Sequence, residues 1–186
     1  MIKGANKPIL LVGLGTLWDN ASSSMVSLAE HLGAPVLTTS KCKGAIIEDH
    51  PLRAGCIIGG LIERNLVSRS DLIVSIGLDA VELQPKGWPY PTKVLSIASH
   101  PSLDGLVACN EEVIGNLDSI LRVLRTIVPK GNDWGYDAAR DFRASVHKAL
   151  DTPSTGLSPQ RAVEIARTIL PRDTIATCDA GASRLL

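Results

Sequence analysis

The chain has 186 residues, of which 45% are hydrophobic and 20% charged, enough for one well-buried core and the start of a second unit. Lysine plus arginine and aspartate plus glutamate are balanced at 19 each, which argues against nucleic acid or an acidic membrane surface as a partner. No apolar run is long enough to span a membrane, and Met1 to Lys7 lack the features of a signal peptide, so we expect a cytoplasmic protein.

Short apolar runs alternate with amphipathic helical patterns, which is typical of a parallel sheet covered by helices on both faces. In chain order, the predicted elements are a strand at 7–13, a helix at 19–32, a strand at 36–39, a long crossover at 43–70, strands at 71–77, 93–97 and 111–114, and a helix at 117–128. The last helix is expected to turn Leu117, Ile120, Leu121, Leu124 and Ile127 toward the core. The pattern predicts an α/β fold with a doubly wound, Rossmann-like parallel sheet.

The composition becomes more polar after Pro129, and residues 130–156 are predicted to be a linker that contains one short helix. Ser158 and Pro159 signal the start of a helix at 161–170, which a strand at 173–178 follows. A lone helix and strand cannot bury both their faces, so we expect this end to be truncated or completed by another piece of protein. The predicted division is a central domain at 1–129, the linker at 130–156 and the start of a second domain at 157–186.

A nucleotide crevice is one candidate site. Gly13-Leu14-Gly15 follows the first strand like the start of a dinucleotide fingerprint, and Gly77 ends the central strand. Trp18 occupies the place of the third glycine, and no acidic residue ends the second strand, so a tight turn is favoured over NAD binding. Gly13, Gly15 and Gly77 remain the candidates for a nucleotide crevice.

Other features leave alternatives open. The glycine-bearing segment 55–60 is either a crevice loop or the start of a helix. Asp79 and Glu82 follow the central strand where a ligand crevice would lie, or they are solvated loop charges. The four cysteines and four histidines are scattered, without the spacing of a zinc, redox or nucleophilic site. We therefore assign no catalytic residue and no metal ligand.

Several segments resemble the central domain of the thiamine-diphosphate-dependent decarboxylases and carboligases, a family that includes acetolactate synthase, benzoylformate decarboxylase and oxalyl-CoA decarboxylase. The resemblance is carried by Lys7 to Gly15, Leu32 to Thr39, Lys43 to Leu52 and Ser70 to Gly77, in that order and spacing. It covers residues 7–128 and implies a six-stranded central domain.

The tail is similar to the first helix and strand of the family's thiamine-diphosphate-binding domain, at residues 157–170 and 173–181. In that family the loop after this strand approaches the cofactor diphosphate, which implies a cofactor-binding role for Gly181, Ala182 and Ser183. Backbone amides and a hydroxyl suit an anion.

The resemblance implies a parent enzyme that uses thiamine diphosphate and Mg²⁺ to break or form a bond beside the carbonyl of a 2-oxo acid. The family's activating glutamate and its Gly-Asp-Gly to Asn motif do not occur in this sequence. We therefore expect the chain alone to be inactive and to hold no cofactor. The implied partners are the remaining domains or subunits of the parent enzyme, within a homo-oligomer.

Some relatives bind flavin or a nucleotide on the central domain. Asp79 and Ala80 stand where the resemblance implies an arginine and an aromatic residue that contact flavin, and Ala98 stands where it implies an acidic residue. An aspartate facing a diphosphate is repulsive, so weak or no FAD binding is predicted. The alternatives to the family reading are a free-standing module that binds ADP, CoA or FAD, and a structural subunit.

Overall fold

The computed structural model describes residues 1–57, 62–83, 89–101, 109–151 and 155–177. The chain divides into two compact units, Met1–Ala144 and Ser145–Leu186. The first unit contains the whole sheet, and within the described residues no helix is long and apolar enough to cross a membrane.

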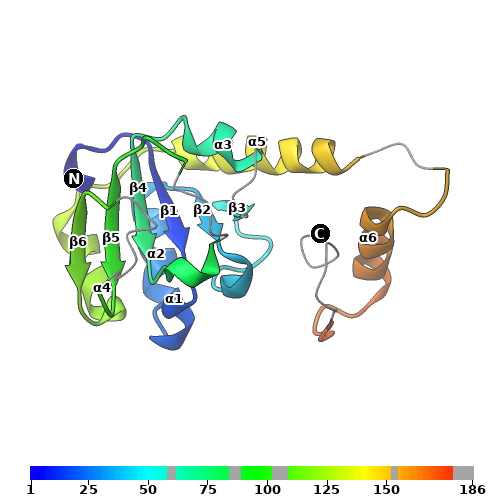
Figure 1. The fold of residues 1–186 in the computed structure, drawn as a ribbon, viewed down its shortest axis with the longest axis horizontal. Coiled ribbons are helices and arrows are strands. Elements are labelled where there is room, and N and C mark those ends of the chain that lie inside the picture. The colour runs from blue at the N-terminus through cyan, green and yellow to red at the C-terminus, as the bar shows by residue number, and fades with distance from the viewer. Residues whose placement is uncertain (58–61, 84–88, 102–108, 152–154, 178–186) are drawn as a thin grey trace. The chain divides into compact units, whose positions relative to one another are not determined.

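The first unit is built on a six-stranded sheet in which every neighbouring pair of strands is parallel. Its strands are β1 (Pro8–Val12), β2 (Val36–Thr38), β3 (Arg53–Cys56), β4 (Leu72–Ile76), β5 (Val94–Ala98) and β6 (Glu111–Ile114). They lie in the order β3-β2-β1-β4-β5-β6, with β3 and β6 at the edges (Figure 1). The predicted α/β, doubly wound fold is confirmed.

Helices cover both faces of this sheet, because successive side chains of a strand point to opposite sides. The helices of the first unit are α1 (Gly15–Trp18), α2 (Ser22–Leu32), α3 (Ile62–Val67), α4 (Leu117–Ile127) and the start of α5 (Trp134–Leu150), with short 3₁₀ turns η1 (Ile2–Gly4), η2 (Ser40–Cys42) and η3 (Ala80–Glu82). On one face Leu10 and Val12 of β1 join a core with α2 and α4. On the other face, Ile9 and Leu11 face Val67 of α3.

Strand β3 lies within the segment that the sequence pattern assigned to a long crossover at 43–70, so that expectation is wrong. Its sequence Arg-Ala-Gly-Cys has no run of β-branched or aromatic residues, and its pairing with β2 shifts register between Val36 and Leu37. The segment 55–60 is accordingly strand at Gly55 and Cys56, and residues 58–60 lie outside the described part. The strand is the sixth that the family resemblance implies.

Helix α5 is the second correction, because it has 17 residues and fills most of the segment predicted to be a linker with one short helix. Although its composition is polar, α5 has a buried face, because its buried residues are spaced so that they lie on one side of a helix. These residues are Gly135, Ala138, Ala139 and Phe142. Phe142 lies against Gly55 of β3, where an added Cβ would be 3.3 Å from its ring. The first half of α5 is therefore part of the packed first unit.

Two helix details also differ from expectation. The predicted helix at 19–32 begins only at Ser22, because Asn20 adopts a positive φ of 53° between α1 and α2. In α4, Leu117 and Leu121 are buried and Ile120 and Leu124 are partly buried, as predicted. Ile127 is instead mostly exposed, although Leu124 and Val128 on either side of it in the chain pack into the core.

The second unit contains α6 (Pro159–Ile169), which begins as predicted. The Ser158 hydroxyl accepts a hydrogen bond from the Arg161 amide, and a proline follows the cap. None of the residues of α6 is buried. The strand predicted at 173–178 is not formed over its described residues 173–177.

Candidate functional site at the switch point of the sheet

The strand order places a topological switch point between β1 and β4, the two central neighbours from which the sheet grows in opposite directions. In open α/β sheets, ligands bind at such a point, outside the carboxyl ends of the strands. Three connections meet here: the turn after β1 at Gly13–Gly15, the residue Thr39 after β2, and the segment Gly77–Glu82 after β4. This meeting point, with these residues, is called the switch-point crevice below.

The three glycines expected to line a nucleotide crevice are brought together by the fold. The Gly15 amide donates to the Gly77 carbonyl at 2.9 Å. A Cβ on Gly13 would lie 2.5 Å from that same carbonyl oxygen, and Gly77 has a φ of +57° that favours glycine. The glycines therefore let the turns after β1 and β4 pack backbone against backbone.

The carboxylate of Glu82 is the central polar group of the switch-point crevice. Both of its oxygens accept hydrogen bonds from the Leu14 amide at 3.0 Å. It also accepts from the Asp79 amide at 2.9 Å and from the Thr39 hydroxyl at 2.6 Å. Of the two readings left open for Glu82, the structure thus excludes a freely solvated loop charge.

Cys42 is hydrogen-bonded to two of the segments that form the crevice. Its thiol is fully buried and donates to the Gly13 carbonyl at 3.0 Å, while its amide donates to the Thr39 hydroxyl at 3.2 Å. Burial, and then the negative charge of Glu82, raises the pKa of the Cys42 thiol from 9.0 to about 12. A thiol that stays protonated is a weak nucleophile, so Cys42 is a packing and hydrogen-bonding residue.

We expect Cys42 to resist alkylation at about pH 8 in the folded protein, while the exposed Cys109 reacts. Peptide mass spectrometry after iodoacetamide treatment would measure both, and the same treatment in denaturant should label both. Equal labelling of the two thiols in the folded protein would contradict the buried, protonated state of Cys42.

The raised thiol pKa also predicts a loss of stability in alkali. The folded protein holds this proton up to about pH 12 and the unfolded chain releases it near pH 9.0, so the free energy of unfolding should fall as the pH rises between these values. Burial likewise raises the pKa of Tyr90 to about 12, which acts in the same direction. Denaturant unfolding at a series of pH values would measure the slope, and Cys42→Ala should make it shallower but not remove it.

The side chains of the other described residues singled out from the sequence do not join this cluster. Asp79 is exposed, and its carboxylate accepts from the Val81 amide. Ala80 belongs to η3, and Ala98 ends β5. Trp18 is 70% exposed on α1. Gly181, Ala182 and Ser183 lie outside the described residues.

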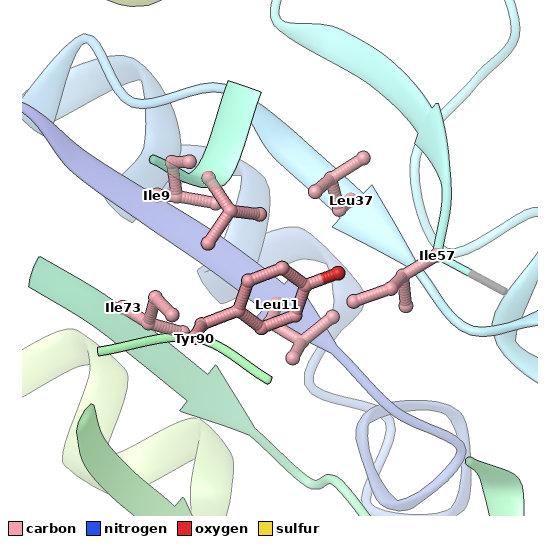
Figure 2. Close-up of a pocket in the computed structure, with 7 residues that line it drawn as sticks. Ile9, Leu11, Leu37, Ile57, Ile73 and Tyr90 are labelled. Atoms are coloured by element: carbon pink, nitrogen blue, oxygen red, sulfur yellow. The ribbon is translucent and has the colours of Figure 1, made fainter. Parts of the chain in front are cut away.

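A second gap lies on the α3 face of the sheet and is entirely apolar. Figure 2 shows the side chains around it, which are Ile9, Leu11, Leu37, Ile57, Val67, Ile73 and Tyr90. The space between these side chains is too narrow for a water molecule. It is therefore a packing gap in the core, without the convergent polar groups of a ligand site.

The family model described as "Thiamine pyrophosphate enzyme, central domain" matches residues 1–124. The chain belongs to this family. The resemblance carried by the strand and turn sequences is thereby confirmed. The sheet that holds the switch-point crevice is the thiamine pyrophosphate enzyme central domain.

Relatives of this central domain are large enzymes. The protein named "Probable acetolactate synthase large subunit" from Methanococcus aeolicus is 26% identical over the whole chain, which covers 35% of that protein. Sulfoacetaldehyde acetyltransferase from Alcaligenes xylosoxydans xylosoxydans is 32% identical over 58% of the chain and 19% of its own length. The chain spans about a third of the length of the first curated relatives.

A solved structure shares the fold. Benzoylformate decarboxylase from Polynucleobacter necessarius matches with a TM-score of 0.72, covering 94% of the chain and 33% of that protein at 19% identity. This similarity supports the architecture of the central domain, and at this identity it carries no conclusion about substrate.

The family name implies thiamine diphosphate, and the described residues do not fit it. Among them, no group of three or more histidine, cysteine or acidic side chains could hold a metal ion. The switch-point crevice presents the carboxylate of Glu82 where a diphosphate would need free amide donors. No step of thiamine chemistry is therefore assigned to the described part of the central domain.

Proposed function

We propose that this chain is the central, scaffolding domain of a thiamine-diphosphate-dependent 2-oxo acid decarboxylase or carboligase that resembles acetolactate synthase. The family match over residues 1–124 carries the proposal. The switch-point crevice supports a scaffolding role, because its polar groups are engaged with one another and its thiol is held protonated. In this proposal the chain is not a catalyst by itself.

The proposal extends to the domain division. Residues 157–186 are the start of the thiamine-diphosphate-binding domain, and Gly181, Ala182 and Ser183 approach the cofactor diphosphate in the parent enzyme. Thiamine diphosphate and Mg²⁺ bind the parent, where neighbouring domains supply the remaining ligands. The share of the relatives that the chain spans supports such neighbours. We place the parent enzyme in the cytoplasm as a homo-oligomer.

Turnover of 2-oxo acids tests this function. The chain and a parent protein that carries it together with its neighbouring domains would be assayed for CO₂ release from benzoylformate and a panel of other 2-oxo acids, with thiamine diphosphate and Mg²⁺. We expect release by the parent, dependent on thiamine diphosphate, and none by the chain. Turnover by the chain alone, or a parent inactive on every 2-oxo acid, would overturn the proposal.

The proposed domain division can be tested through the exposed apolar residues of α6. Ile165 and Ile169 are 37% and 74% exposed, and a surface of this kind drives association when its natural cover is missing. We expect the isolated chain to self-associate, and Ile165→Ser/Ile169→Ser to reduce that association. Size-exclusion chromatography with light scattering would measure it.

The matched control uses the two exposed apolar residues of α4, replaced in Val123→Ser/Ile127→Ser. This variant should associate as the unchanged chain does. If the control dissociates the chain and the α6 variant does not, the association surface lies on the central domain and the division proposed for residues 157–186 loses its support.

A further inference from the structure

The switch-point crevice contains a negatively charged side chain, the carboxylate of Glu82. Among the described residues, three segments that follow three different strands donate hydrogen bonds to the Glu82 carboxylate. Leu14 follows β1, Thr39 follows β2 and Asp79 follows β4. These are the positions from which backbone and hydroxyl donors reach ligand phosphates in nucleotide-binding sheets.

We infer that Glu82 is a specificity-determining residue that closes the switch-point crevice to phosphate-bearing nucleotides. Its carboxylate occupies the Leu14 amide, the donor nearest the turn after β1. A phosphate oxygen that approached this amide would compete for the same hydrogen and would meet a like charge. Charge-assisted hydrogen bonds are the stronger kind, so displacement of the carboxylate is costly.

The backbone leaves no room for both groups. A Cβ added to Gly13 would lie 2.6 Å from the nearer Glu82 oxygen, which places the carboxylate directly against the turn. On its other side the turn is held through the hydrogen bond from the Cys42 thiol to the Gly13 carbonyl. A nucleotide could enter only if η3 moved away together with Glu82.

The inference goes beyond the proposed function, because it concerns which ligands the central domain rejects. It also gives the predicted weakness of FAD binding a different basis. The sequence argument rested on Asp79, whose carboxylate instead accepts from the Val81 amide. The group placed to repel a diphosphate is Glu82.

The test combines calorimetric titration with ADP and hydrogen exchange of the Leu14 amide, on the complete chain. Glu82→Gln removes the charge with little change of shape, Glu82→Ala removes the carboxylate, and Glu111→Gln on β6 is the charge-matched control. We expect no ADP binding by the unchanged chain or by Glu111→Gln. Glu82→Ala should bind ADP with a dissociation constant at least about tenfold below the weakest binding that the titration can detect.

Hydrogen exchange keeps the test decisive if Glu82→Ala fails to fold. In Glu82→Gln the Leu14 amide should exchange at least about tenfold faster than in the control, because a charged acceptor has been lost. The inference is overturned if the unchanged chain binds ADP with protection at Leu14, or if Leu14 exchange is unaltered in Glu82→Gln. Folded Glu82 variants that lose this protection yet bind no ADP would also overturn it. These readouts need no turnover, so they can fail independently of the proposed function.

Discussion

Gly77→Ala is expected to lower the free energy of unfolding by about 3 kcal/mol or more. Gly77 has a φ of +57°, and an added Cβ would lie 2.5 Å from the Thr16 nitrogen and 2.8 Å from the Gly15 carbonyl carbon. Those atoms are backbone of the turn after β1, which could yield only by opening the switch-point crevice. Urea denaturation of the purified chain would measure the loss.

Two other glycines separate backbone strain from steric overlap. Gly44 also has a positive φ, of +98°, but an added Cβ would meet nothing within 4 Å, so Gly44→Ala should cost only about 1–2 kcal/mol. Gly4 has open space and no such φ, and Gly4→Ala should change stability by less than about 0.5 kcal/mol. If Gly77→Ala lost no more stability than Gly44→Ala, the segment after β4 would not be in contact with the turn after β1.

Leu121→Ala should cost about 2–5 kcal/mol, because it leaves a cavity between α4 and the sheet. Leu121 is fully buried in the core with α2. The control is Val123→Ala on the same helix, where 56% exposure predicts a change within about 0.5 kcal/mol. Denaturant unfolding of both variants would measure the difference, and similar losses would contradict the described packing of α4.

Burial on both faces favours apolar residues, and this pattern predicted β1, β2 and β4, whereas β6 was predicted at its exact bounds although all four of its residues are exposed. Every residue of β1, β2 and β4 is buried, and each of these strands was recognised within two residues of its bounds. Strand β3 was missed because its own sequence, Arg-Ala-Gly-Cys, has no strand pattern, and its stability depends on neighbours that are distant in the chain. These neighbours are β2, with which it pairs, and Phe142 of α5, which lies against Gly55.

The candidate site was only half predictable, for a related reason. The turn glycines were recognised because a local motif places glycine directly after a strand. The role of Glu82 could not be read locally, since its partners Leu14 and Thr39 are 68 and 43 residues away in the chain. Only the parallel sheet, which gathers the carboxyl ends of separate strands, brings these groups within hydrogen-bond distance.

The two borders of the sheet are protected against intermolecular strand addition by different means. At β3, the Arg143 guanidinium of α5 donates to the carbonyls of Arg53 and Pro51, so a helix occupies part of that border. At β6 all four residues are exposed, and two of them are the glutamates Glu111 and Glu112. If β6 of one molecule paired with β6 of another, carboxylates of the two molecules would come together, which disfavours aggregation through this edge.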